Sequence, residues 1–228
     1  MQIISIINQK GGVGKTTTAI NLAAGLSKQN KKILIIDLDP QGNATTGLGL
    51  SNIENSSDTI YGVLNGTKEF SGVIKKTKFE NLDIITSNVD LSGLEVETAD
   101  DTERAFILKR KLTAYLNDSR ASYDYALIDC PPSLSLLTVM ALVSSHSLLV
   151  PLQTEFFALE GLTQLMKTID RIKVNLNPKL EIRGILLTMY DKRNKLSSQV
   201  EKEARDYFKE KVYTTVIPRN VRLSEAPS

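Results

Sequence analysis

Short apolar runs alternate along the chain with longer segments that have helical spacing. The apolar runs occupy residues 3–7, 32–37, 82–86, 125–129, 148–152, 184–189 and 212–217. Most of them lack period-two alternation, and continuous apolar runs are typical of strands that are buried on both faces of a parallel sheet. These runs therefore predict the strands of a mostly parallel sheet.

Helical periodicity fills several of the intervals between the predicted strands. Apolar positions recur every three or four residues in segments 16–30, 102–117, 159–174 and 196–208. Strands that alternate with helices need crossover connections, which are right-handed in parallel sheets. The pattern predicts an α/β fold with a three-layer, doubly wound sheet.

One segment, residues 42–80, is less regular and is rich in Asn, Ser, Gly and Thr. This composition favours loops, with one or two short helices around residues 59–64. No linker-like break, internal repeat or low-complexity tract interrupts the 228 residues. We therefore expect one domain over residues 1–228.

Composition narrows the class of protein only slightly. The chain is 41% hydrophobic and 24% charged, with a net charge of +2, so no global field indicates a nucleic-acid or membrane partner. Residues 1–7 lack the features of a secretory signal, and no apolar stretch reaches the roughly 18–20 residues of a membrane-spanning helix. The single cysteine, Cys130, excludes an internal disulfide. We expect a soluble, cytoplasmic protein.

The first chemical motif is Gly11-Gly12-Val13-Gly14-Lys15-Thr16-Thr17, between the first predicted strand and the first predicted helix. Glycines let backbone amides turn toward phosphate oxygens, and a helix amino terminus adds free N–H groups and a positive dipole end. Lys15 can reach the β- and γ-phosphates, and the Thr16 hydroxyl can bind Mg²⁺. A glycine-rich turn with a solvated lysine is the alternative, but the strand-to-helix position favours a P-loop that binds a nucleotide.

Carboxylates follow two of the predicted strands. Asp37 and Asp39 come after the second, which we expect beside the first, and Asp129 ends the strand at 125–129. Carboxylates at such strand ends can hold a magnesium-bound water or orient the attacking water. Asp129 is the Walker B-like candidate for Mg²⁺ through water. For Asp37, a water-mediated magnesium contact and a turn-opening, helix-capping role remain equally open.

Lys10, the residue directly before the glycines, indicates which family of P-loop proteins this chain resembles. Lys10-Gly11-Gly12-Val13-Gly14-Lys15-Thr16-Thr17 resembles the deviant Walker A motif of the ParA/MinD superfamily. In that superfamily the extra lysine crosses a nucleotide-sandwich dimer to the partner's nucleotide. The resemblance implies that Lys10 and Lys15 both serve catalysis, in a homodimer that forms with ATP.

Further strings resemble chromosomal ParA (Soj-type) partition ATPases. They lie at residues 39–45, 129–133, 155–161 and 217–227, and the last separates these proteins from MinD. The resemblance implies Asp39 in hydrolysis, Mg²⁺ as cofactor, and Pro218 and Asn220 in the adenine pocket. Family members continue beyond the Ser-Glu-Ala-Pro-Ser stretch, so we expect the family's C-terminal tail to be absent here.

The same resemblance implies non-specific DNA binding, a nucleoid location and a ParB-type centromere-binding partner. Such binding needs only cations aimed at phosphates. Basic residues follow two predicted strands, and the resemblance points to Arg193 and Arg222 as the DNA contacts. In residues 201–211 acidic and basic residues alternate, which indicates a solvated, ion-paired helix face.

Three other functions stay open at this level. A MinD-like membrane-positioning ATPase needs an amphipathic C-terminal helix, which this sequence does not contain. An electron-transfer ATPase like the nitrogenase iron protein needs two cysteines per chain for its shared cluster, and only Cys130 is present. A DNA scaffold that uses nucleotide only structurally would be distinguished by its lack of turnover.

Overall fold

The computed structural model describes residues 1–50, 55–118, 122–221 and 223. Through them runs an eight-stranded sheet in the order β3-β4-β2-β5-β1-β6-β7-β8. Its strands are β1 (Gln2–Ile6), β2 (Ile33–Asp37), β3 (Ile74–Lys76), β4 (Leu82–Ile85), β5 (Tyr125–Asp129), β6 (Ser147–Gln153), β7 (Glu181–Tyr190) and β8 (Val212–Pro218). All neighbouring strands are parallel except β3, which is antiparallel to β4. The predicted mostly parallel sheet is confirmed.

The described helices include the four that the periodicity predicts. The α-helices of the described residues are α1 (Lys15–Ser27), α2 (Asn43–Gly47), α3 (Ile60–Leu64), α4 (Leu94–Glu97), α5 (Ile107–Leu116), α6 (Leu136–Ser144), α7 (Ala158–Asn175) and α8 (Lys195–Phe208). The four predicted ones are α1, α5, α7 and α8. The helix expected from residue 102 begins later, because Arg104–Phe106 forms a 3₁₀ turn. Helix α6 was not predicted, since its sequence LLTVMALVS is apolar almost all round and carries no helical period.

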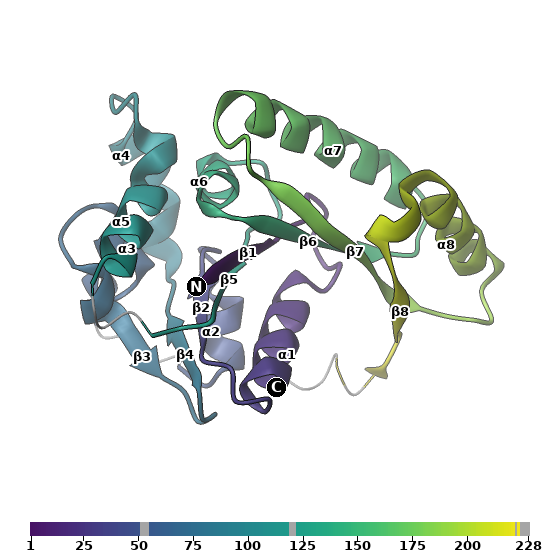
Figure 1. Cartoon of the computed structure of the whole chain (residues 1–228), viewed down its shortest axis with the longest axis horizontal. Coiled ribbons are helices and arrows are strands. Elements are labelled where there is room, and N and C mark those ends of the chain that lie inside the picture. Colours follow the sequence, from purple (N-terminus) through teal and green to yellow (C-terminus); the bar gives the residue numbers. More distant parts are fainter. Residues whose placement is uncertain (51–54, 119–121, 222, 224–228) are drawn as a thin grey trace.

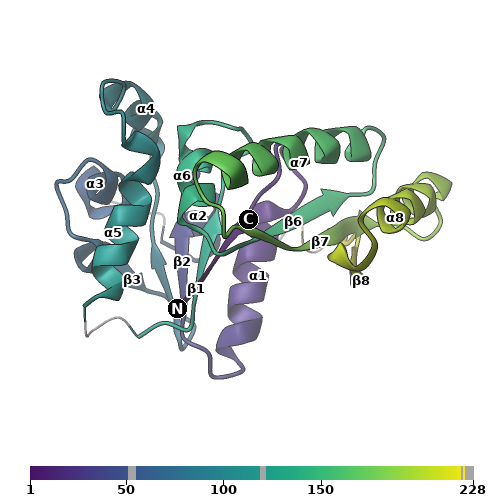
Figure 2. The ribbon, with the colours of Figure 1, turned by 45° about the horizontal axis from the view of Figure 1, so that its top comes forward.

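Helices cover both faces of the sheet and give the predicted three layers (Figures 1 and 2). Helices α1 and α2 lie on one face, and α5, α6 and α7 lie on the other. Alternate residues along β2 serve the two layers, since Ile33 and Ile35 pack with α1, whereas Leu34 and Ile36 pack with α3 and α5. No helix in the described ranges is both long and apolar enough to cross a membrane.

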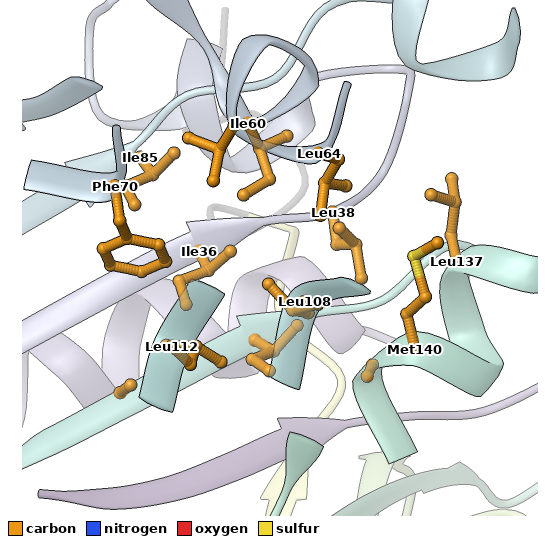
Figure 3. Close-up of a cluster of buried hydrophobic side chains, with 14 of the residues drawn as sticks. Ile36, Leu38, Ile60, Leu64, Phe70, Ile85, Leu108, Leu112, Leu137 and Met140 are labelled. Atoms are coloured by element: carbon orange, nitrogen blue, oxygen red, sulfur yellow. The ribbon is translucent and has the colours of Figure 1, made fainter. Parts of the chain in front are cut away.

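The core beneath α3 and α5 shows why these helices form where they do (Figure 3). Ile60 and Leu64 of α3 point toward Ile36 of β2, and Leu108 and Leu112 of α5 approach the same strand from below. These side chains are almost fully buried. Burying each large aliphatic side chain contributes about 1.5–3 kcal/mol, so this packing fixes the outer half of the sheet.

Strand β5 lies between β1 and β2, which corrects the expectation that β1 and β2 are neighbours. Asp129 at the end of β5 pairs in register with Ile6 of β1 and with Asp37 of β2. The carboxyl ends of these three parallel strands therefore meet at one edge of the sheet. The glycine loop, the Asp37–Asp39 turn and Asp129 all emerge there.

Candidate functional site: a phosphate loop flanked by carboxylates

The glycine loop leaves β1 and leads directly into α1. Gly12 (φ 74°) and Gly14 (φ 87°) adopt left-handed conformations that side chains with a Cβ rarely take. Gly14 caps α1, and it has no side chain that could accept a hydrogen bond from the first amides of the helix. These N–H groups are therefore available to an anion at the positive end of the helix dipole.

Two polar side chains that the sequence analysis missed fasten this loop. The Asn8 amide donates to the Pro151 carbonyl (2.7 Å), and its Oδ1 accepts from the Lys10 N–H (3.0 Å). The Thr188 hydroxyl of β7 donates to the Val13 carbonyl (2.8 Å). Asn8 had a detectable signal, because it is a polar residue directly after an apolar strand, whereas Thr188 is distant in sequence.

Lys15 is the first residue of α1, and only 7% of its surface is exposed. Its ammonium donates to the Lys10 carbonyl oxygen at 3.1 Å. Burial lowers the pKa of Lys15, and the nearby Asp129, Cys130 and Asp39 oppose that shift. The side chain is thus held as a partly desolvated cation at the mouth of the loop, where an anionic ligand would pair with it.

Lys10 points away from this cluster. Its Nζ lies 2.9 Å from Oε2 of Glu155, in the loop between β6 and α7, and both side chains are about half exposed. The Gln153 side chain donates to the other oxygen of Glu155. The structure therefore places the two loop lysines in different environments, one buried beside carboxylates and one paired at the surface.

Asp37 ends β2 and is fully buried. Its Oδ2 accepts hydrogen bonds from the backbone N–H (2.8 Å) and the hydroxyl (2.7 Å) of Thr45. Its Oδ1 accepts from the Asp39 N–H at 3.2 Å. Burial raises the pKa of Asp37 to about 6, while the Thr45 and Asp39 hydrogen bonds act in the opposite direction. Both carboxylate oxygens thus have partners within the loop itself.

Asp39 lies beyond the end of β2, so the two aspartates do not share the face of one continuous strand. Its Oδ1 accepts a hydrogen bond from the Gln41 N–H at 3.0 Å. Only 6% of its surface is exposed, yet it lines the cleft beside the glycine loop. Asp39 is the carboxylate that the described cleft presents to a ligand.

Asp129 ends β5 and is fully buried. Neither of its oxygens has a hydrogen bond of good geometry among the described residues, although the Thr16 hydroxyl lies near enough to oppose the rise in its pKa. Burial raises its pKa to about 8, and Asp37 and Asp39 add to this shift. A buried carboxylate without a partner costs free energy, which a bound cation or its water ligands would offset.

These residues fit one Mg²⁺ ion shared with a bound nucleotide. In the described part of the chain, no three His, Cys, Asp or Glu side chains converge closely enough to hold a metal alone. Magnesium commonly keeps several waters and takes only one or two protein ligands together with phosphate oxygens. Thr16 at the start of α1 and the buried Asp129 beside it suit that mode of binding.

The cleft itself has a volume of about 560 Å³. One side is formed by the glycine loop and the first turn of α1, including Gly11, Gly12, Gly14, Lys15, Thr16 and Thr17. The other side comes from the end of β8 and the residues after it, including Pro218 and Asn220. The structure thus brings the two residues expected at an adenine next to the loop expected at phosphates, although about 200 residues separate them.

The structure describes only one of the two arginines that are expected to contact DNA. Arg193 is 90% exposed in the loop after β7, where its guanidinium makes a two-point pair with Asp191 (Nε–Oδ1 3.0 Å, Nη2–Oδ2 2.9 Å). This pairing holds the pKa of Asp191 at about 2. Arg222 lies outside the described residues. Arg219, from the same string, lines the nucleotide cleft.

Comparisons with known proteins agree with this site. Residues 1–182 match a sequence family described as an AAA domain. The chain is 52% identical to the chromosome partitioning protein ParA of Caulobacter vibrioides (strain NA1000 / CB15N), covering 100% of this chain and 84% of that protein. It is 50% identical to the sporulation initiation inhibitor protein Soj of Bacillus subtilis (strain 168), covering 100% of this chain and 88% of Soj.

Solved structures show the same fold. A cobyrinic acid a,c-diamide synthase from Mycobacterium smegmatis, with bound ADP and magnesium, superposes with a TM-score of 0.88 at 36% identity, over 100% of this chain and 91% of that one. A putative plasmid partition protein from Borrelia burgdorferi bound to AMPPNP superposes with a TM-score of 0.82 at 30% identity, over 99% and 88% of the two chains. By sequence identity and by fold, this chain belongs to the ParA/Soj family of chromosome-partitioning P-loop ATPases.

Proposed function

We propose that this protein is an ATP-hydrolysing switch for DNA segregation, in which residues 1–228 act as one ATPase domain. The observation that carries the proposal is the shared cleft, where the glycine loop and the buried Lys15 face the Asp39 carboxylate. Its relatives are named as chromosome partitioning proteins along the whole length of this chain.

The roles of the loop residues follow from their positions. Amides of Gly11, Gly12, Gly14 and the first turn of α1 bind phosphate oxygens, with Val13 held by Thr188 so that the loop keeps its shape. Lys15 neutralises the β- and γ-phosphates, and Thr17 donates from the helix start. Pro218 and Asn220 bind the adenine. The protein thus contributes position and charge, which dominate catalysis of phosphoryl transfer.

Mg²⁺ bound here would neutralise charge on the phosphate oxygens. Thr16 would hold it directly, and Asp129 would hold one of its waters. Asp37, whose oxygens already accept hydrogen bonds from Thr45 and Asp39, would contribute at most through a further water. Asp39 orients the attacking water, since it is the carboxylate that lines the cleft.

The switch requires a second copy of the chain and a DNA surface. Lys10 leaves Glu155 and reaches the nucleotide of the partner copy when ATP brings two chains together. The dimer then binds DNA without sequence preference through Arg193 and Arg222, which places the protein on the nucleoid. A ParB-type centromere-binding protein stimulates hydrolysis and returns the chains to the unbound state.

Substitution of Asp39 tests the catalytic part of this proposal. Asp39→Ala should retain ATP binding and reduce steady-state hydrolysis by a factor of about 100 or more, as removal of a positioned catalytic group generally does. Asp170→Ala, an exposed aspartate on α7, is the matched control and should hydrolyse ATP at the wild-type rate. Unchanged turnover in Asp39→Ala would refute the role assigned to this carboxylate.

A further inference from the structure

The loop that carries Asp39 is closed by one buried hydroxyl group. The chain leaves the sheet at Asp37 and returns at Thr45 in α2, and the two residues are 0% and 2% exposed. The Thr45 N–H and Oγ1–H both donate to Asp37 Oδ2, at 2.8 and 2.7 Å. Because these bonds join the two ends of the loop, its length and path are fixed at the base.

The closed loop rests on the exit of the neighbouring strand β4. The Ser87 N–H donates to Thr45 Oγ1 at 3.0 Å, so the hydroxyl both donates and accepts. On the other side, Gly42 has a φ of 62°, and a Cβ at that position would lie 3.2 Å from the Ser87 carbonyl oxygen. Ser87 therefore bonds the loop through Thr45, and its carbonyl oxygen lies so near Gly42 that a Cβ there would be crowded.

The same group of bonds reaches Asp39. The second oxygen of Asp37 accepts from the Asp39 N–H at 3.2 Å, and Asp39 Oδ1 accepts from the Gln41 N–H at 3.0 Å. Asp39 lines the nucleotide cleft, whereas Thr45 and Asp37 do not. The Thr45 side chain does not line the cleft itself; its hydrogen bonds connect to Asp39 through Asp37, while its neighbours Asn43 and Thr46 in α2 line the cleft.

We infer that Thr45 is a positioning residue for hydrolysis, which holds the Asp39 carboxylate in place by bonding Asp37 and seating the loop on Ser87. This inference rests on the proposed role of Asp39. A buried hydroxyl is needed because valine has the same shape but can neither donate to Asp37 nor accept from Ser87. Small displacements of a catalytic group reduce the rate steeply, whereas phosphate binding by the glycine loop does not depend on this contact.

The test compares Thr45→Val with Thr45→Ser in the full chain. Thr45→Val should lower kcat roughly 10- to 100-fold while the Kd for a non-hydrolysable ATP analogue stays within about twofold. Thr45→Ser, which keeps the hydroxyl, should restore most of the rate. A merely structural role for Thr45 would lower stability without this division between kcat and nucleotide binding.

The matched control is Thr59→Val. Thr59 is also fully buried, and its hydroxyl donates to the Ser56 carbonyl (2.7 Å) and accepts from the Tyr61 N–H (3.2 Å), but it caps α3 away from the cleft. It should lose stability and keep kcat. A wild-type kcat in Thr45→Val, or an equal loss in Thr59→Val, would overturn the inference.

A double-substitution cycle separates this inference from the proposed function. If Thr45 acts through Asp39, adding Thr45→Val to Asp39→Ala should not reduce the residual single-turnover rate further. Multiplicative losses would overturn the positioning role, while an Asp39→Ala variant with wild-type turnover would instead refute the proposed catalytic role of Asp39. Should Thr45→Val fail to fold, Gly42→Ala displaces the same loop from Ser87, and it should lower kcat with nucleotide binding preserved. An unchanged kcat in that variant would also overturn the inference.

Discussion

The Lys10 ammonium and the Glu155 carboxylate lie 2.9 Å apart, although they belong to loops that follow different strands, β1 and β6. Their side chains are 50% and 45% exposed, so water screens the pair. Exposed ion pairs of this kind contribute about 0–1 kcal/mol. A contact of this strength is compatible with the proposed dimer, in which Lys10 leaves Glu155 for the nucleotide phosphate bound to a second copy.

Removing the Glu155 charge should favour self-association in the presence of nucleotide. Glu155→Gln frees Lys10 from a competing anion, and a change of up to about 1 kcal/mol corresponds to roughly a fivefold lower dimer dissociation constant. Sedimentation velocity with a non-hydrolysable ATP analogue measures this constant. In a Lys10→Ala background the same substitution should have no effect, and a gain there would contradict the competition between Glu155 and the partner nucleotide.

Loss of the Lys15 ammonium should abolish nucleotide binding. Lys15→Ala removes the buried cation at the head of α1, and isothermal titration with ATP and Mg²⁺ should show affinity at least about 100-fold weaker, as expected for the loss of charge-assisted hydrogen bonds. Lys28→Ala, at the exposed C-terminal end of the same helix, is the control and should bind normally. Normal binding by Lys15→Ala would remove the lysine from the site.

The stability of the nucleotide-free protein should fall as pH rises through the folded pKa of Asp129. Its pKa is raised to about 8 by burial first and by Asp37 second, so the folded state holds a proton that the unfolded state loses above pH 4. The stabilisation is complete below the unfolded pKa and is lost as pH increases toward 8. Thermal unfolding between pH 5 and 9 should therefore show a smaller decline in Asp129→Asn than in the wild type, and equal declines would contradict the assignment.

Arg193 and Asp191 should influence DNA binding in opposite directions. Arg193→Ala removes the proposed phosphate contact and should reduce the slope of log affinity against log salt by about 1. Asp191→Asn frees the arginine from its two-point partner and should strengthen binding at low salt. Fluorescence anisotropy with DNA duplexes of unrelated sequence measures both effects. Unaltered salt slopes in both variants would place the DNA contact elsewhere.

The switch itself predicts that DNA affinity depends on the nucleotide. Binding should be strong with ATP and weak with ADP or without nucleotide, because in the proposed switch only the ATP dimer presents two sets of cations to one duplex. The same anisotropy titration under the three conditions tests this. Equal affinity in all three would contradict a nucleotide-controlled DNA-binding state.

Much of the fold was predictable because the spacing of apolar residues differs between buried strands and amphipathic helices. Uninterrupted apolar runs identified the parallel strands, and the period of α1, α5, α7 and α8 identified their helices. This spacing did not identify α6, which is apolar on nearly all sides, or β3, an edge strand of three residues with the sequence IKK. Their positions depend on neighbours that only the folded sheet provides.

The sequence by itself determined the ligand chemistry of this protein, because a glycine loop at a strand-to-helix junction forms its phosphate site from adjacent backbone amides. It also identified Asp39 and Asp129 as candidates, since strand ends are readable locally. Only the tertiary structure decided which carboxylate faces the cleft, which lacks a good hydrogen bond among the described residues and which is bound by Thr45. Those distinctions arise because parallel pairing places β5 between β1 and β2 and brings Ser87 under a loop more than 40 residues earlier in the chain.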